Sequence, residues 1–203
     1  MSLRERQKAT RTRDIVAAAA TLFGKRGYAN TTVEDVAAAA GVAPGTIYNY
    51  FKSKDGLLQA ILEAHIQERK AEREDFFEAM PGDLDVAVET FVGLMLDRAF
   101  VLVNREIWRQ ILASGITGGR DRNDLLAEIT GTLVLQFERL FRTFQKQGKL
   151  APGIRVRDLA EAAMGIADFH FYRLARHDEL AVGTVKARIR AQLKLLLRGA
   201  LPR

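Results

Sequence analysis

A short stretch near the N-terminus, residues 41–56 (GVAPGTIYNYFKSKDG), combines residue types that can recognise nucleic acid. Pro44 predicts the start of a helix in which Ile47 and Phe51, four residues apart, share one face. We expect these two apolar side chains to pin the helix to a core, so that the other side chains face outward. The outward residues are Pro44, Gly45, Thr46, Tyr48 and Asn49, and two lysines, Lys52 and Lys54, lie just behind them.

These residue types suit the major groove of DNA. Thr46 and Asn49 can hydrogen-bond to base edges or phosphates, and Tyr48 offers both a hydroxyl and an apolar ring. Gly45, which has no side chain, allows the helix to approach the groove wall closely. The stretch therefore predicts a surface that reads DNA.

Three further residues are expected to hold the phosphate backbone. Lys52 and Lys54 follow the short helix, and Lys54 falls in the first turn of the next helix, whose backbone N–H groups also favour an anion. Thr32 can serve the other strand in the same way. A packed pair of helices with a tyrosine on its surface would show a similar pattern, so the spacing alone does not decide for DNA.

The elements that position these residues read as three short helices. The first covers about 12–26 and ends at Gly27, and the second covers 32–40 with an acidic residue in its first turn. After a tight turn at 41–43, the third covers 44–51. The second and third helices are expected to form a helix-turn-helix, whose second helix enters the major groove.

Charge favours the same interpretation. Residues 1–54 carry 9 Lys+Arg against 4 Asp+Glu, whereas the other 149 residues carry 22 against 21. Nearly all of the net charge of +6 therefore lies in the first quarter of the chain. A basic module attached to a near-neutral body indicates a polyanionic partner for that module.

The remainder of the chain also reads as helix, with 4 prolines in 203 residues and no sustained alternation of apolar and polar residues. We therefore expect an all-α fold of about nine helices. Ser53 is expected to cap a fourth helix that buries Leu57, Leu58, Ile61 and Leu62. The later helices are expected near 84–103, 105–113, 123–147, 156–176 and 182–198.

The stretch RDIVAAAATLFGKRGYANTTVEDVAAAAGVAPGTIYNYFKSKDGLLQAIL, residues 13–62, resembles the N-terminal domain of the TetR family of bacterial transcriptional regulators. The resemblance implies a DNA-binding domain over residues 1–53, and a ligand-binding and dimerisation domain over 54–203. It also implies a homodimer, an operator in double-stranded DNA, and a repressor that a small molecule releases. Ala43 departs from the family pattern, which often has a serine there that could cap the third helix.

The family architecture places the dimer interface on the last two helices. Leu193, Leu195, Leu196 and Leu197 cannot all face one core, so part of that apolar surface is expected to meet a second copy. Small residues in the preceding helix would allow close approach of the two helices. The expected interface residues are Ala160, Ala163, Ala167, Ile189, Leu193 and Leu196, although a ninth helix buried within one monomer would show the same pattern.

A ligand cavity is expected among the fifth to eighth helices, and its occupant is expected to be mainly apolar. Arg105 and Arg109 share a face and could meet an anionic group, or could instead pair with Glu106 or Glu138. Each aromatic candidate could equally be ordinary core. The expected lining is Phe91, Met95, Arg105, Trp108, Arg109, Phe137, Phe141, Phe169 and His170.

Other functions find less support in the sequence. The chain has no cysteine, and its three histidines lack the spacing of metal ligands. No phosphate loop, nucleophile elbow or carboxylate–histidine arrangement indicates catalysis, so no cofactor and no enzymatic activity are expected. Without a signal peptide or membrane span, the expected location is the cytoplasm. A DNA-binding regulator controlled by a protein partner remains an alternative, as does a helical enzyme that uses the helix-turn-helix as scaffold.

Overall fold

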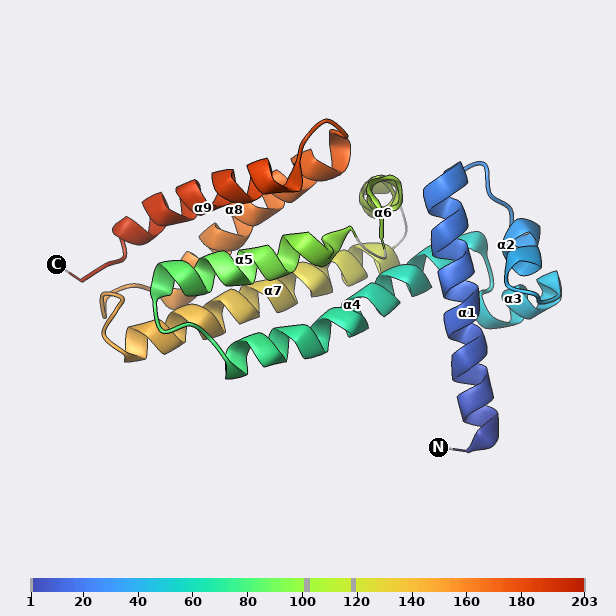
Figure 1. Cartoon of the computed structure of the whole chain (residues 1–203), viewed down its shortest axis with the longest axis horizontal. Coiled ribbons are helices and arrows are strands. Elements are labelled where there is room, and N and C mark those ends of the chain that lie inside the picture. The colour runs from blue at the N-terminus through green and yellow to red at the C-terminus, as the bar shows by residue number, and fades with distance from the viewer. Residues whose placement is uncertain (1, 101–102, 118–119, 203) are drawn as a thin grey trace. The chain divides into compact units, whose positions relative to one another are not determined.

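The computed structural model describes residues 2–100, 103–117 and 120–202 (Figure 1). Over those residues the chain forms nine helices and no strand, as the sequence predicted. Their bounds are α1 (Leu3–Arg26), α2 (Val33–Ala39), α3 (Pro44–Phe51), α4 (Lys54–Glu78), α5 (Leu84–Ala99), α6 (Arg105–Thr117), α7 (Arg120–Lys146), α8 (Val156–Arg176) and α9 (Val182–Arg198).

Most of the predicted helices match these bounds, but the first does not. We expected α1 to begin near residue 12, whereas it begins at Leu3 and has 24 residues. The first buried residue of α1 is Ile15, so its early turns carry no apolar stripe that could have predicted them. A capping box supplies the start signal instead, because the Ser2 hydroxyl accepts from Glu5 N–H at 3.2 Å and the Glu5 carboxylate accepts from Ser2 N–H at 2.6 Å.

The chain divides into two compact units. Unit 1 comprises the described residues of 1–69 and 100–117, and unit 2 comprises those of 70–99 and 118–203. The first part of α4 and all of α6 thus belong with α1–α3, whereas a domain boundary after residue 53 was expected.

Unit 1 has its own apolar core beneath the three N-terminal helices. Ile15 and Phe23 from α1, Val36 from α2 and Ile47 from α3 are all fully buried. The residues that we expected α4 to bury are also in this core, with Leu57, Leu58, Ile61 and Leu62 at most 3% exposed. Each aliphatic side chain buried in this way contributes about 1.5–3 kcal/mol of transfer free energy. This core holds α3 in place while leaving its other face exposed.

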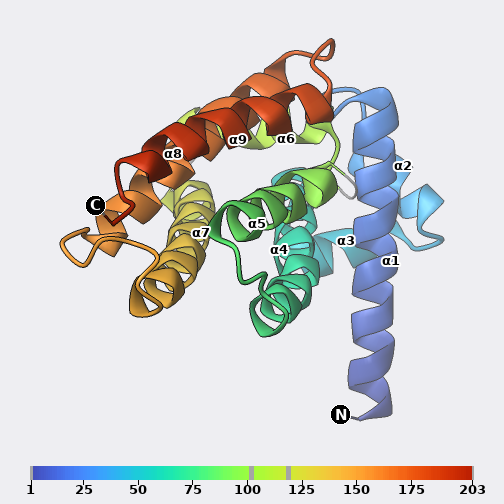
Figure 2. The ribbon, with the colours of Figure 1, turned by 60° about the vertical axis from the view of Figure 1, so that its left-hand side comes forward.

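Unit 2 is a helical bundle in which α7 packs on α8, α8 on α9, and α9 on α5. Phe91 of α5 meets Phe137 of α7 edge-on, with ring centroids 5.0 Å apart. Three ion pairs then join α5 to α9 along their length: Asp97–Lys186 at 2.7 Å, Glu89–Arg190, and Asp85–Lys194 at 3.5 Å. Along this series the residue numbers fall on α5 and rise on α9, so the two helices are antiparallel (Figure 2).

Candidate DNA-binding site

The N-terminus of α2 is fixed by Thr32 and Asp35. The Asp35 carboxylate accepts hydrogen bonds from the Thr32 backbone N–H at 2.9 Å and from its hydroxyl at 2.8 Å. In return, Asp35 N–H donates to Thr32 Oγ1 at 3.1 Å. The two hydrogen bonds from Thr32, chiefly the one from its backbone N–H, hold the pKa of the Asp35 carboxyl below its usual value. Thr32 is exposed, but its hydroxyl is already part of this capping box.

The turn between α2 and α3 is made by residues 40–43. Gly41 has a φ of +65°, in the left-handed region that favours glycine. Val42 N–H closes the turn onto Ala37 O at 2.9 Å. Ala43 is the N-cap residue of α3 and supplies no side-chain bond, so the missing serine is not replaced as a cap. Pro44 at the start of the helix partly compensates, because it removes one N–H group that would need a partner.

The two faces of α3 differ in their exposure. Ile47 lies on the buried face and is 0% exposed, as the sequence predicted. Tyr48 is 48% exposed, and Pro44, Gly45 and Asn49 are also exposed. Thr46 is half-buried. Phe51 is half-buried rather than part of the core, because its ring faces a surface groove. The helix therefore presents a continuous surface of small and polar groups around one aromatic ring.

The junction between α3 and α4 is tight. Ser53 N–H reaches Phe51 O at 2.7 Å, and Lys52 between them has a φ of +63° and a ψ of −32°. This is a γ-turn with positive φ, which is rare and strained for a residue with a side chain. Gly56 lies against the same carbonyl, since a Cβ there would stand 1.9 Å from Phe51 O. The backbone at Lys52 thus stores strain, and its side chain is exposed at the junction.

Lys54 is held more closely than we expected. Its ammonium lies 4.2 Å from the centre of the Tyr28 ring and donates to Ala29 O at 3.4 Å. The Tyr28 hydroxyl in turn donates to the Asp55 carboxylate. Lys54 therefore joins the start of α4 to the loop between α1 and α2, in addition to the phosphate contact expected of it.

Of the residues expected to line a ligand cavity, those in unit 2 are mostly ordinary core. Phe91, Phe137 and Phe141 are 0% exposed and pack on one another, and Met95 is half-buried. Phe169 is not interior in the monomer, because 58% of its surface is exposed on α8. His170 is buried between α8 and α9, where its Nε2 lies 3.0 Å from Gln192 Oε1.

The remaining lining residues, Arg105, Trp108 and Arg109, lie on α6 in unit 1. Arg109 pairs with Glu106 at 3.1 Å, the first of the two carboxylates considered for it. The guanidinium of Arg105 lies 5.8 Å from the Phe100 ring. Trp108 is 5% exposed and meets the His65 ring edge-on at 5.6 Å. The sequence had not indicated that His65 and Arg69 of α4 would be buried, each only 8% exposed.

The residues expected at a dimer interface mostly face inward. Ala160, Ala163 and Ala167 of α8 are at most 3% exposed, as are Ile189 and Leu193 of α9. In the single chain they are buried, on helices that pack on α7, α5 and each other, so they present no exposed surface to a second copy. Leu196 is half-buried. The exposed apolar side chains of these helices are Phe169, Tyr172 and Leu195.

The described residues contain neither a candidate membrane span nor a candidate metal site. None of the helices within 2–100, 103–117 and 120–202 is long and apolar enough to cross a membrane. In the same ranges, no three His, Asp or Glu side chains are grouped so that they could hold a metal ion.

Comparison with known proteins agrees with the geometry of the site. Residues 15–61 match the sequence family "Bacterial regulatory proteins, tetR family", and this range contains both helices of the helix-turn-helix. The chain is 28% identical over 185 residues to the HTH-type transcriptional regulator UidR of Escherichia coli (strain K12), covering 86% of this chain and 88% of UidR. It is 25% identical over 149 residues to the HTH-type transcriptional repressor KstR2 of Rhodococcus jostii (strain RHA1), covering 60% and 73%.

The fold is also shared with solved structures. A transcriptional regulator from Saccharomonospora viridis, crystallised in complex with choline, superposes with a TM-score of 0.70 at 23% identity, covering 96% of this chain and 100% of that one. The all-helical fold, the helix-turn-helix of α2 and α3, and these relatives lead to one conclusion. The chain is a transcriptional regulator of the TetR family.

Proposed function

We propose that this regulator is a repressor that binds an inverted-repeat operator as a homodimer and leaves it when a small molecule binds. The observation that carries the proposal is the exposed surface of α3, where Tyr48 and Asn49 stand clear of a core that holds Ile47. This surface lies in the most basic quarter of the chain. The relative KstR2 is named a repressor, which supports repression rather than activation of transcription.

The dimer is proposed to form through the outward faces of α8 and α9. Phe169 is 58% exposed, Tyr172 46% and Leu195 65%, although all three are large and apolar in part. Exposed small residues continue both faces at helical spacing: Ala162 and Gly165 on α8, and Ala187 and Ala191 on α9. We name these seven residues the α8–α9 outer face. Small residues beside exposed aromatic rings suit close packing of helices from two protomers.

Two-fold symmetry would present two copies of α3 to the DNA. A dimer whose recognition helices stand about 34–36 Å apart meets two half-sites one turn of DNA apart. A small molecule that changes this spacing would weaken binding, because only one half-site could then be engaged. The choline complex of the Saccharomonospora viridis regulator supports control by a small molecule for a protein of this fold.

The proposed effector is mainly apolar and is sensed through α6. Trp108 of α6 supports this because it is an apolar, buried side chain. As the only tryptophan in the chain, it would also report binding through its emission. Arg109 is engaged by Glu106, so an anionic group on the effector is not part of the proposal.

Selection from a pool of random DNA duplexes tests the DNA-binding part of the proposal. The protein should enrich an inverted repeat whose half-site centres are about 10 base pairs apart. Failure to enrich any sequence would reject operator binding. Enrichment of one unpaired half-site would reject the symmetric dimer.

Titration with apolar compounds tests effector control. A compound that releases a labelled copy of the selected duplex should change Trp108 emission over the same concentration range. Release without any change in Trp108 emission would reject α6 as the sensor. If no compound released the DNA, control by a protein partner would replace this part of the proposal.

A further inference from the structure

The first turns of α1 form an extension that no other part of the described chain covers. We name residues 3–11 the N-terminal arm. Every residue of the arm is exposed, and even Leu3 exposes 74% of its surface. Figures 1 and 2 both show this end of α1 continuing well beyond α2 and α3. The arm therefore contributes little to the core of unit 1.

The arm is nevertheless a regular helix. Its first turn is closed by the capping box of Ser2 and Glu5, and its last residue leads directly into the part of α1 that carries Ile15 and Phe23. An isolated helix of this length would be marginal in water, but continuation from a packed helix avoids the cost of nucleation. Nine residues at 1.5 Å each span about 13 Å, or about four base pairs of DNA. The arm thus holds its side chains at defined spacings.

The arm and the residues just after it are strongly basic. Over residues 3–14 the five cations Arg4, Arg6, Lys8, Arg11 and Arg13 outnumber the two acids, Glu5 and Asp14, and Glu5 caps the helix. Across residues 2–100, 103–117 and 120–202, none of these five side chains forms an ion pair with a carboxylate. Such a concentration of unpaired positive charge repels itself and favours a polyanionic partner.

Helical spacing sorts the five charges into two rows. Arg4, Lys8 and Arg11 are related by four and three residues, so they lie on one face. Arg6 and Arg13, seven residues apart, lie together on the opposite side. The two rows therefore cannot meet the same surface.

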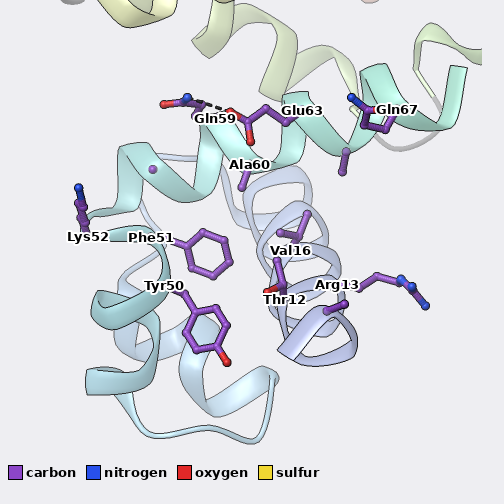
Figure 3. Close-up of a pocket in the computed structure, with 13 residues that line it drawn as sticks. Thr12, Arg13, Val16, Tyr50, Phe51, Lys52, Gln59, Ala60, Glu63 and Gln67 are labelled. Atoms are coloured by element: carbon purple, nitrogen blue, oxygen red, sulfur yellow. Dashed lines mark hydrogen bonds between the residues drawn. The ribbon is translucent and has the colours of Figure 1, made fainter. Parts of the chain in front are cut away.

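One contact shows which row lies beside the recognition helix. The ammonium of Lys8 lies 5.8 Å from the centre of the ring of Tyr50, which belongs to α3. A groove of about 550 Å³ runs between α1, the end of α3 and α4, and Tyr50 and Phe51 form part of its wall. In Figure 3 the Arg13 side chain points away from both rings. Arg13 thus lines the groove without approaching α3, whereas Lys8 reaches Tyr50 of α3, and Arg4 and Arg11 continue the Lys8 face of α1. We call Arg4, Lys8 and Arg11 the row beside α3.

We infer that Arg4, Lys8 and Arg11 bind DNA phosphates outside the base pairs that α3 reads, so that the arm lengthens the footprint of each half-site. This inference rests on the proposed operator binding. The positive row, its regular spacing and its position beside α3 fit a phosphate strand that continues past the groove occupied by α3. Phosphate contacts of this kind add affinity and fix register, and they carry no base specificity.

Two matched double variants of the full-length protein test the inference. R4Q/R11Q removes two charges from the row beside α3, and R6Q/R13Q removes two charges seven residues apart from the other row. Glutamine keeps most of the side-chain length and a similar helix propensity, so both variants should retain the helix. Each is titrated at several salt concentrations with the duplex selected by the parent protein, both with 10 flanking base pairs on each side and trimmed to the two half-sites.

R4Q/R11Q should bind the long duplex at least tenfold more weakly than the parent at about 0.15 M salt. Its plot of log K against log salt should be shallower by about 3–4 units, because a dimer loses four phosphate contacts at about 0.9 each. On the trimmed duplex it should bind like the parent, and R6Q/R13Q should match the parent on both. Equal losses in the two variants, or a loss by R4Q/R11Q that does not depend on the flanks, would overturn the inference.

The same titrations separate this inference from operator binding itself. If the parent selects no sequence, operator binding has failed and the arm has no half-site to extend. If the parent selects a sequence that R4Q/R11Q binds as tightly as the parent on both duplexes, only the role of the arm is rejected.

Discussion

The ammonium of Lys54 lies 4.2 Å from the centre of the Tyr28 ring, and so the first residue of α4 is joined to the loop between α1 and α2. A cation over an aromatic face at this distance contributes about 0.5–1 kcal/mol when exposed. The contact holds a positive charge between the start of α4 and the loop that leads into α2. Lys54 is therefore expected to affect both DNA affinity and stability.

Replacing Lys54 with Met should lower the free energy of unfolding by about 0.5–1 kcal/mol, because the contact with Tyr28 is lost. It should also weaken binding to selected and unselected DNA by a similar factor, since a phosphate contact carries no base specificity. Urea unfolding and fluorescence anisotropy measure the two effects. Loss of affinity for the selected sequence alone would contradict the phosphate role.

Lys52→Gly is the matched control, because it removes a charge from the same junction. Glycine relieves the positive φ of the γ-turn, so the free energy of unfolding should rise by about 1 kcal/mol. DNA affinity should still fall. A less stable Lys52→Gly protein would show that the turn is not strained.

Two glycines in this region should respond in opposite ways to alanine. A Cβ at Gly56 would stand 1.9 Å from Phe51 O, so Gly56→Ala should cost about 1–3 kcal/mol of stability. A Cβ at Gly45 would meet no atom of the described chain within 4 Å, so Gly45→Ala should preserve or slightly raise stability. Gly45→Ala should nevertheless weaken DNA binding, because the new methyl group would face the wall of the DNA major groove. If Gly45→Ala bound the selected duplex like the parent, close approach at Gly45 would be rejected.

The dimer surface can be tested with two leucines that lie two residues apart on α9. Leu195→Glu places a charge on the α8–α9 outer face, which should give a folded monomer. Leu193→Glu places the charge in the core, where Leu193 is 1% exposed, and should unfold the protein. Circular dichroism and light scattering separate the two outcomes. A stable Leu195→Glu dimer would exclude this face as the interface.

Asp168 should make the protein less stable as pH rises. Burial raises the pKa of its carboxyl to about 6, from 3.8 as a free group. Between these values the folded protein binds more protons than the unfolded one, so the free energy of unfolding falls as pH rises through this window. Asp168→Asn should remove that loss and be about 1 kcal/mol more stable than the parent at pH 7, after discounting for solvent screening of this half-buried group.

Urea titrations of both proteins at pH 4 and pH 7 check this difference, which isolates Asp168 from other titrating carboxylates. The advantage of Asp168→Asn should be small at pH 4 and larger at pH 7. An advantage that is the same at both values would show that the pKa of Asp168 is not raised.

The helix-turn-helix could be predicted from the sequence because its signals are local. Pro44 at a helix start, Thr32 and Asp35 in a capping box, and the spacing of Ile47 each determine structure within a few residues. The arm was missed because its signal is a capping box alone, without an apolar stripe. Local sequence patterns were therefore sufficient to predict the helices whose packing requires the same residues to be buried.

The outward face of the last two helices could not be predicted in the same way. Leu193 and Leu195 lie in one leucine-rich stretch, separated by Lys194, and either could continue a helical stripe. Only the packing of α9 on α5 and α8 decides that Leu193 is buried and Leu195 exposed. Phe169 was misplaced for the same reason, since an aromatic residue in an apolar helix can face either way.

The central claim, that α3 reads DNA sequence, is tested most directly by the affinity of Tyr48→Ala for the selected duplex and for a mixed-sequence duplex of equal length. Tyr48 is 48% exposed, so the variant should fold like the parent. It should lose at least tenfold in affinity for the selected duplex, while its affinity for the mixed-sequence duplex should change little, because the phosphate contacts remain. A folded Tyr48→Ala protein that still prefers the selected duplex as strongly as the parent would contradict the account.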